Sequence, residues 1–176
     1  MPSDHEYLYA LATHPEMTMR WRYRGASVPF EQFLQHLWGN TLVHFVVERK
    51  DGGQRLGYIQ AFDAAERHGW CHFALMLDPS LERSGWAIEC LPLFLNYVFT
   101  VWPMRKLYAV VLESNYPELA SGAGKWFVVE GRLAEHEFYD DRYWDLLLVT
   151  VRREDWEASG PAIVEKLTGP PRSEAS

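Results

Sequence analysis

Apolar side chains recur at helical spacing in two short segments near the start of the sequence. In residues 5–13 (HEYLYALAT) they fall on one helical face, and Pro15 limits this helix on its C-terminal side. Residues 29–39 (PFEQFLQHLWG) carry a stronger apolar stripe. Pro29 lies early in that segment and Gly39 after its last apolar residue, as is typical of helix boundaries. The chain is therefore predicted to open with two helices.

The pattern changes to β-rich runs between residues 41 and 77. Two runs of β-branched and aromatic residues flank an Asp-Gly-Gly turn at 51–53, which is a strong hairpin signal. A second turn at 64–69 leads into a third run, WCHFALMLD at 70–78. We expect a three-stranded antiparallel meander.

A long apolar segment, AIECLPLFLNYVF at 87–99, follows and is predicted to be a helix. Pro92 lies inside it, so the helix either kinks there or becomes regular only near residue 90. The remaining elements are predicted to be a strand at 106–115, a weak glycine-containing helix at about 117–125, and two final strands at 127–141 and 142–151.

The order of these elements favours one α/β (α+β) domain, with a mixed central sheet and helices on both faces. We expect this domain to span residues 1–157. Residues 158–176 are predicted to form a C-terminal tail that is disordered from about Gly169 onward, because its end is polar and rich in proline.

Composition and charge limit the classes of partner that the protein is expected to bind. The chain has 176 residues, 48% of them hydrophobic, and a formal net charge of −7. An acidic balance argues against a nucleic-acid or anionic-membrane partner and is compatible with a cationic small molecule. No segment approaches about 18 uninterrupted apolar residues, and the start lacks a signal-peptide pattern. A cytoplasmic protein is expected, and the edge of the predicted sheet leaves a homodimer open.

Cysteine and histidine spacing predicts no metal site. Cys71 and Cys90 lie in apolar runs without CxxC or Cys/His spacing, so both are expected to be free, buried thiols. His136 lies between glutamates, but successive strand residues point to opposite faces. The sequence also lacks G-x-S-x-G, HExxH and Walker A motifs, so hydrolase, metalloprotease and NTPase functions have no support.

The loop within DPSLERSGWAIEC (78–90) joins a predicted strand to the long helix. The first N–H groups of a helix have no intrahelical partner and attract anions, and Gly85 would let backbone approach a phosphate closely. Ser84 and Arg83 add a hydroxyl and a cation. The segment is either an anion site or an ordinary strand–helix corner.

Three stretches together resemble GNAT-superfamily N-acetyltransferases, in particular the branch that includes ribosomal-protein and polyamine N-acetyltransferases. They are LMLDPSLERSGWAIECL, RKLYAVVLESN and KWFVVEGRLAEHEFYDDRYWDLLLV, and the likeness runs from about residue 5 to Trp156. The resemblance implies a mixed, mostly antiparallel sheet and acetyl-CoA as co-substrate.

The resemblance also implies which residues hold acetyl-CoA. Asn115 matches the asparagine near the pantetheine arm, and it equally fits a helix N-cap, since Glu118 follows at N-x-x-E spacing. Backbone contacts are expected from the loop to the pyrophosphate and from the preceding strand to pantetheine: Arg83, Ser84, Gly85, Trp86 and Ala87 in the loop, and Leu75, Met76 and Leu77 in the strand.

Three positions depart from the pattern of the family. Glu82 replaces the first glutamine or arginine of the loop motif, and Trp126 replaces a glycine. Gly122 stands where members often place the tyrosine that protonates the departing thiolate. These departures leave open a GNAT-fold protein that binds acyl-CoA without turnover.

Acetyl transfer to an amine benefits from a general base and from an acid for the thiolate. Glu113, at the end of its predicted strand, is either a partly desolvated base or a solvated carboxylate. His72 is either a base or a hydrogen-bonded histidine on the sheet face. Ser121 or Tyr116 is a candidate for the missing acid, with a plain loop role as the alternative.

The segment 135–145 (EHEFYDDRYWD) is the densest polar and aromatic stretch. Glu137 and Asp140 are candidates for attracting an ammonium group, and Tyr139 and Tyr143 for stacking on it. The alternative is a solvated hairpin loop.

The sequence as a whole predicts an acetyl-CoA-dependent N-acetyltransferase that acts by direct transfer in a ternary complex. The acceptor is expected to be a primary amine of a small cationic molecule, such as a polyamine, and next a peptide N-terminus. The alternatives are the non-catalytic acyl-CoA-binding protein and a transferase of another acyl or aminoacyl group.

Overall fold

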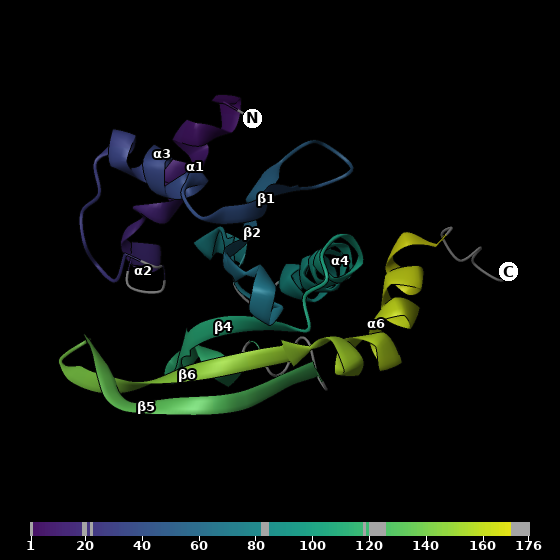
Figure 1. Ribbon diagram of the computed structural model, residues 1–176. Coiled ribbons are helices and arrows are strands. Elements are labelled where there is room, and N and C mark those ends of the chain that lie inside the picture. Colours follow the sequence, from purple (N-terminus) through teal and green to yellow (C-terminus); the bar gives the residue numbers. More distant parts are fainter. Residues whose placement is uncertain are drawn as a thin grey trace, which may run out of the picture.

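The computed structural model describes residues 2–18, 21, 23–81, 85–117, 119 and 126–169 (Figure 1). In this part of the chain six strands form one sheet, in the order β1-β2-β3-β4-β6-β5. The strands are β1 (Thr41–Glu48), β2 (Arg55–Ala65), β3 (Trp70–Leu77), β4 (Lys106–Leu112), β5 (Phe127–Tyr139) and β6 (Arg142–Arg152). The helices are α1 (His5–Ala12), α2 (Pro15–Thr18), α3 (Phe30–Trp38), α4 (Trp86–Val101) and α6 (Arg153–Thr168).

The meander and the mixed sheet are confirmed. Strands β1, β2 and β3 pair antiparallel in sequence order, and β4, β6 and β5 form a second antiparallel group. The two groups meet where β3 pairs with β4 in parallel. The sheet is therefore mixed and mostly antiparallel, as predicted.

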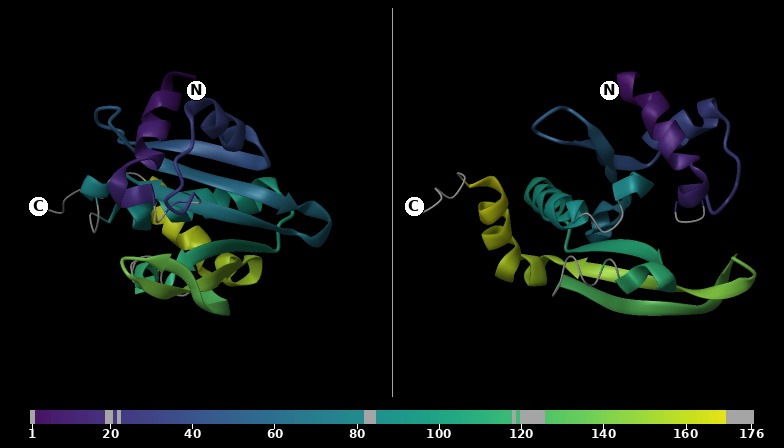
Figure 2. Two further views of the ribbon diagram at one scale, coloured as in Figure 1. Left: turned by 90° about the vertical axis from the view of Figure 1, so that its left-hand side faces the viewer. Right: turned by 180° about the vertical axis from the view of Figure 1, so that it is seen from behind.

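Helices cover both faces of the sheet (Figures 1 and 2). On one face, α1 and α3 pack against β2 and β3 around a buried cluster that includes Leu11, Phe33 and Met76. On the other face, α4 packs across both strand groups, and its buried Phe94 and Leu95 share a cluster with residues from β2 to β6. Successive residues of β3 alternate between the two clusters, as expected of a buried strand.

Helix α4 begins at Trp86, which excludes one of the two alternatives for Pro92, a helix that becomes regular only near residue 90. Pro92 lies inside the helix and is fully buried. It lacks an N–H, which leaves the Ile88 carbonyl without its helical partner and costs about 3 kcal/mol. Burial of an apolar side chain contributes roughly 1.5–3 kcal/mol, and several such side chains of α4 outweigh that cost: Leu91, Phe94, Leu95 and Val98.

Strand β4 ends at Leu112, three residues earlier than predicted. Residues Glu113–Asn115 form the short 3-10 helix η4 instead of continuing the strand. The helix expected at about 117–125 lies mostly outside the described residues, although Tyr116 and Pro117 are helical.

The last two strands form a long hairpin that reaches into the predicted 135–145 loop. Only Asp140 and Asp141 form its turn, both with positive φ (54° and 55°). A bulge in β5 between Leu133 and Glu137 is accompanied by a positive φ at Glu135 (48°).

Helix α6, like the short helix α2, was not predicted from the sequence pattern. It spans Arg153–Thr168, so the expected domain boundary at residue 157 falls inside it, and residues 158–168 are helical. Gly160 and Pro161 have poor helix propensity, but Gly160 packs against the Trp156 ring. Trp126 completes this contact. Residues 170–176 of the predicted tail lie outside the described residues.

None of the described helices is both long enough and apolar enough to cross a membrane.

Candidate functional site

Strands β3 and β4 separate soon after they meet. They pair only at Trp70–Lys106, Cys71–Leu107 and His72–Tyr108. Beyond His72, β3 stays paired with β2 up to Leu77, while β4 stays paired with β6 up to Leu112. Within the described part of the chain, the facing edges of the two strands are therefore unpaired, and we call the opening between them the cleft.

The free edge of β3 carries the residues predicted to hold pantetheine. Leu75, Met76 and Leu77 all lie beyond the last pair with β4. Met76 is buried and Leu75 packs against the core, so these side chains are used by the fold. Their backbone groups lie in the plane of the sheet. An extended ligand with amide groups can pair with such an edge as an added strand does.

The start of α4 follows the same end of β3. Gly85 caps the helix in the left-handed conformation (φ 87°), and a Cβ built on it would meet no described atom within 4 Å. The first-turn N–H groups at Trp86 and Ala87 need no intrahelical acceptor and suit an anion. The guanidinium of Arg49 lies 5.7 Å from the centre of the Trp86 ring. Arg83 and Ser84 lie outside the described residues, as does Glu82.

His72 occupies the last paired position, at the narrow end of the cleft. The rings of Phe62, Trp70 and Tyr108 surround it at centroid distances of 5.7, 5.5 and 6.0 Å. Burial lowers the pKa of His72, and the nearby carboxylate of Asp63 opposes this effect. Its buried Nδ1 has no hydrogen-bond partner among the described residues. His72 therefore presents a neutral imidazole at neutral pH.

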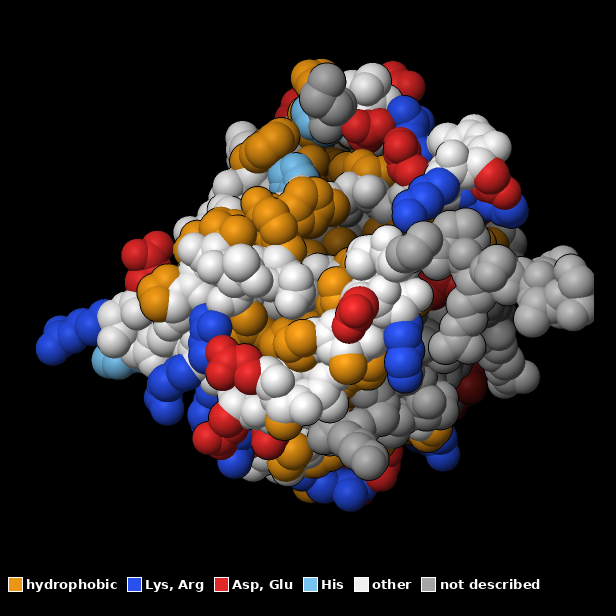
Figure 3. All heavy atoms as spheres, turned by 90° about the vertical axis from the view of Figure 1, so that its right-hand side faces the viewer, with side chains coloured by type: hydrophobic (Ala, Val, Ile, Leu, Met, Phe, Trp, Pro, Cys, Tyr) orange, Lys and Arg blue, Asp and Glu red, His pale blue; other side chains and the backbone are white. Residues whose placement is uncertain are grey.

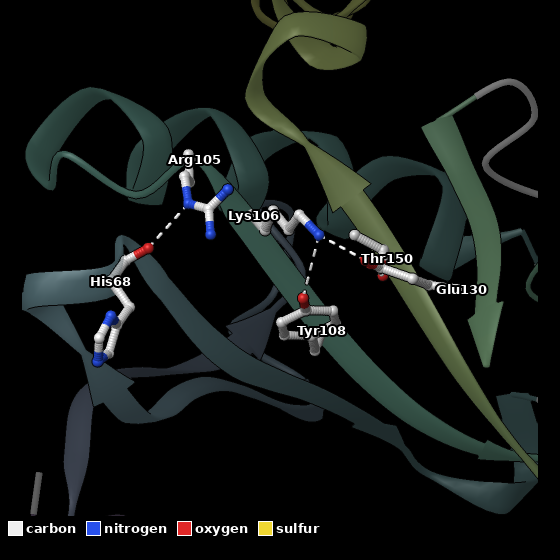
Figure 4. Close-up of polar contacts among 6 residues, drawn as sticks. All are labelled: His68, Arg105, Lys106, Tyr108, Glu130 and Thr150. Carbon is white, nitrogen blue, oxygen red and sulfur yellow. Dashed lines mark hydrogen bonds and ion pairs between the residues drawn. The ribbon is translucent and has the colours of Figure 1, made fainter. Parts of the chain in front are cut away.

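Tyr108, whose ring contacts His72, belongs to a polar cluster that was not predicted from the sequence. Figure 4 shows this cluster. Lys106 Nζ lies 2.5 Å from Glu130 Oε1 and donates to the Tyr108 hydroxyl at 3.3 Å. Thr150 Oγ1 donates to Glu130 Oε2 at 2.6 Å. These hydrogen bonds, that from Lys106 first, hold the pKa of Glu130 below its usual range. The alternation of side chains along the predicted strand indicates that Lys106 and Tyr108 lie on the same face of the sheet. It gives no sign of Glu130, which comes from a segment far away in the sequence.

Of the two alternatives for Glu113, the structure favours the solvated carboxylate. Its side chain is exposed and forms an ion pair with Arg132, which also binds Asp145. Asp145 Oδ1 further accepts a hydrogen bond from the Glu135 N–H at 2.8 Å, and these contacts lower the pKa of Asp145.

Two other predicted residues lie near η4. Asn115 is half-buried within η4, and Glu118, which would complete its capping pattern, lies outside the described residues. Tyr116 packs against the core on the α4 face. Ser121 and Gly122 lie outside the described residues, so the proton donor for the thiolate stays a prediction.

The predicted acceptor residues lie along the far part of the last hairpin. Tyr139, Asp140 and Tyr143 are exposed at its tip. Glu137 faces the other half of the molecule, where its carboxylate lies 3.5 Å from Arg24. The predicted acceptor residues therefore form neither a purely solvated loop, since Glu137 is paired with Arg24, nor a wall of a pocket around His72.

Strand register gives the separation between the tip and His72. His72 pairs with Tyr108, which pairs with Thr150, whereas Glu137 pairs with Trp144. Six residues of extended strand separate Thr150 from Trp144, or about 20 Å. The structure therefore does not bring the predicted base and the predicted acceptor residues together.

Trp126, a departure from the family pattern, has a structural role. It is buried, its Nε1 donates to Ser159 Oγ at 2.7 Å, and its ring packs edge-on against Trp156 at 4.9 Å. It attaches α6 to the sheet and does not enter the cleft chemistry.

Comparison with known proteins agrees with this geometry. Residues 1–120 match the family model described as an acetyltransferase (GNAT) domain. Spermidine N(1)-acetyltransferase of Escherichia coli K12 is 26% identical over 143 residues, covering 77% of this chain and 73% of the relative. The Vibrio cholerae enzyme of the same name is 28% identical over 117 residues, covering 66% of each.

A solved structure supports the fold independently. Spermidine N-acetyltransferase from Vibrio cholerae, in complex with CoA and spermine, superposes with a TM-score of 0.76 at 22% identity. The superposition covers 89% of this chain and 94% of that one. Together with the family model over residues 1–120, it shows that the chain belongs to the GNAT acetyltransferase family.

Proposed function

We propose that this GNAT protein transfers the acetyl group of acetyl-CoA directly to a primary amine of a polyamine. The observation that carries the proposal is the cleft between β3 and β4, with the neutral His72 at its narrow end. The polyamine is proposed because the relatives in two bacteria are named spermidine N(1)-acetyltransferases.

Backbone groups of this chain are proposed to position acetyl-CoA. The free edge of β3 at Leu75–Leu77 offers amide pairing for pantetheine, and the open backbone at Gly85 and the start of α4 offer N–H groups for pyrophosphate. Arg83, Ser84 and Asn115 are proposed as additional contacts. A thioester held in the cleft would have its carbonyl oxygen near unpaired N–H groups, which stabilise the developing oxyanion.

His72 is proposed to act as the general base. The amine nitrogen attacks the thioester carbonyl, an N–C bond forms and the C–S bond breaks. The proton lost by the amine goes to Nε2 of His72, since Nδ1 is buried, and the departing thiolate takes a proton from a donor for which Ser121 is our candidate. Burial keeps His72 neutral and therefore able to accept the proton.

Charge pairing restricts how the acceptor is held. The carboxylates of Glu130, Glu137 and Glu113 each lie against a cation of the protein itself. The hairpin tip with Asp140 and Tyr143 lies about 20 Å from His72 along the strands, farther than an extended spermidine reaches. We propose that the rings around His72 bind the acceptor by cation–π contact, as Trp70 and Tyr108 face this position.

The tip residues retain a smaller proposed role. Glu137, Tyr139, Asp140 and Tyr143 lie beyond the open end of the cleft, where they can attract a polycation before it enters. Acidic and aromatic side chains at an entrance raise the local concentration of a cation without contacting it during reaction.

The first experiment measures thiol release from acetyl-CoA with spermidine, spermine and a neutral primary amine. We expect turnover with the polyamines, and a decrease of roughly 10²–10⁴ in kcat for His72→Gln with little change in acetyl-CoA binding. His136→Gln, an exposed histidine of the last hairpin, is the matched control. Acetyl-CoA binding without thiol release for any amine would favour the non-catalytic alternative and refute this proposal.

A cytoplasmic homodimer is also part of the proposal. Acetyl-CoA is an intracellular metabolite, and β5 lies at an edge of the sheet with one row of backbone groups unpaired among the described residues. Sedimentation velocity at micromolar concentration tests the dimer, and a monomer at all concentrations would remove it.

A further inference from the structure

A second pocket lies where β4 begins and where β6 runs into α6. Its volume is about 450 Å³, and its lining consists only of charged residues: Arg105, Lys106, Arg152, Arg153, Glu154 and Glu157. Figure 3 shows basic side chains gathered among acidic ones at the lower left of the side that carries α6. The pocket adjoins the first residue of β4, whereas the cleft opens toward its last residue.

Two of the four cationic side chains that line the pocket, Arg153 and Lys106, are bound by other groups of the protein. Arg153 donates from Nε to the Met104 carbonyl and from Nη2 to the Trp102 carbonyl, both at 2.7 Å, and its Nη1 lies 3.3 Å from Glu157. Lys106 is paired with Glu130. These contacts fix the walls of the pocket and neutralise two positive charges.

The other two cations, Arg105 and Arg152, form no ion pair within the described residues. Toward the residues that the structure describes, Arg105 donates only from Nε, to the His68 carbonyl at 2.8 Å, which leaves its two terminal nitrogens available there (Figure 4). Arg152 pairs with Lys106 in the β4–β6 register and therefore shares its face of the sheet. The Arg152 Nε is buried and has no acceptor in the described structure. A buried donor without an acceptor is rare in folded proteins and points to a missing partner.

We propose that this pocket binds a small oxyanion, such as a phosphate group, at a site separate from the acetyl-CoA cleft. Guanidinium groups donate paired N–H bonds that match the oxygens of phosphate or carboxylate. An anion between Arg105 and Arg152 would accept hydrogen bonds from the terminal nitrogens of both guanidinium groups and balance two cations. The exposed carboxylates of Glu154 and Glu157 flank the pocket and favour a small anion over a large polyanion.

Inorganic phosphate is the probe, titrated by calorimetry against sodium chloride of matched ionic strength. We expect at least tenfold weaker phosphate binding in Arg152→Gln and in Arg105→Gln. Arg105 is exposed, so its variant keeps the test valid if Arg152→Gln fails to fold. Lys166→Gln, near the other end of α6, makes the same charge change and should bind phosphate like the unmodified protein.

Two further titrations separate this pocket from the cleft. The Gly85→Trp variant should still bind phosphate, and Arg152→Gln should still bind acetyl-CoA. Equal phosphate binding by Arg105→Gln, Arg152→Gln and Lys166→Gln, or no phosphate binding at all, would overturn the proposal. Loss of acetyl-CoA binding in both arginine variants, with phosphate binding unchanged, would assign the arginines to the co-substrate and overturn it as well.

Discussion

The chemistry of the cleft depends on the surroundings of one histidine. His72 is enclosed by three aromatic rings from β2, β3 and β4, and this burial disfavours the imidazolium. Glu113 shows the opposite case, because its carboxylate is exposed and paired with Arg132. Of the two predicted bases, His72, which lies in apolar surroundings, is therefore the better candidate for the general base.

The lowered pKa of His72 predicts how stability changes with pH. The unfolded chain binds a proton near the ordinary value of 6.5, whereas the folded chain binds it only at lower pH. The contribution of His72 is therefore fully favourable above that value, falls as pH decreases through it, and levels off below the folded pKa. His44 has a lowered pKa for the same reason, so the two effects add.

Urea unfolding at about pH 8 and about pH 5.5 tests this prediction. The free energy of unfolding should fall less between these values in His72→Gln than in the unmodified protein. His136→Gln, the same substitution at an exposed position, is the matched control. An identical decrease in His72→Gln would mean that His72 is equally protonated in both states.

At the scale of elements, tertiary contacts stabilise helix α6 against its own sequence. Gly160 and Pro161 interrupt it, yet Trp156 is buried against Trp126, and Ser159 accepts the hydrogen bond from the Trp126 indole. The aromatic burial and this hydrogen bond outweigh the poor helix propensity of glycine and proline. Gly160 is also required for space, because a Cβ there would lie 2.3 Å from a Trp156 ring atom.

Gly160→Ala is therefore expected to lower the free energy of unfolding, whereas a glycine-to-alanine change inside a helix usually raises it. Alanine in a free helix stabilises by about 1 kcal/mol, but here the steric conflict should destabilise the protein by about 1–3 kcal/mol. Urea unfolding measures the difference. Gly52→Ala, at an open position, should change stability little. A more stable Gly160→Ala protein would show that α6 does not pack against the sheet as described.

At the scale of the whole molecule, the cleft lies between two strand groups with few direct links. The contacts that join the groups include three residue pairs between β3 and β4, the packing of α4, and the Arg24–Glu137 contact on the open side. A ligand that pairs with the free edges would connect the groups and stabilise both. At about 100 times its Kd it would add about 2.7 kcal/mol to the free energy of unfolding.

Hydrogen exchange should report this connection directly. Acetyl-CoA is expected to slow exchange of backbone amides at 73–77 and 109–112, and to leave the edge strand β1 unchanged. The Gly85→Trp variant should lose this protection, because the residue is strained at φ 87° and its side chain would fill the open space before α4. Gly52→Trp is the control. Equal exchange with and without acetyl-CoA would show that the cleft is not its site.

The sequence by itself determined most elements, because periodicity and turn residues act locally. The meander, α1, α3, α4 and the last hairpin follow from apolar spacing and from Asp-Gly-Gly at 51–53. The three stretches with their family likeness also sufficed for the GNAT assignment.

Only the tertiary structure decided how the candidate site is assembled. The sequence shows neither where β3 and β4 separate nor which cation neutralises each carboxylate, since both depend on segments far apart in the chain. Lys106 meets Glu130, and Arg24 meets Glu137, only after the sheet has formed. The same reason explains why α6 was missed: its stability comes from Trp126, which lies outside the helix.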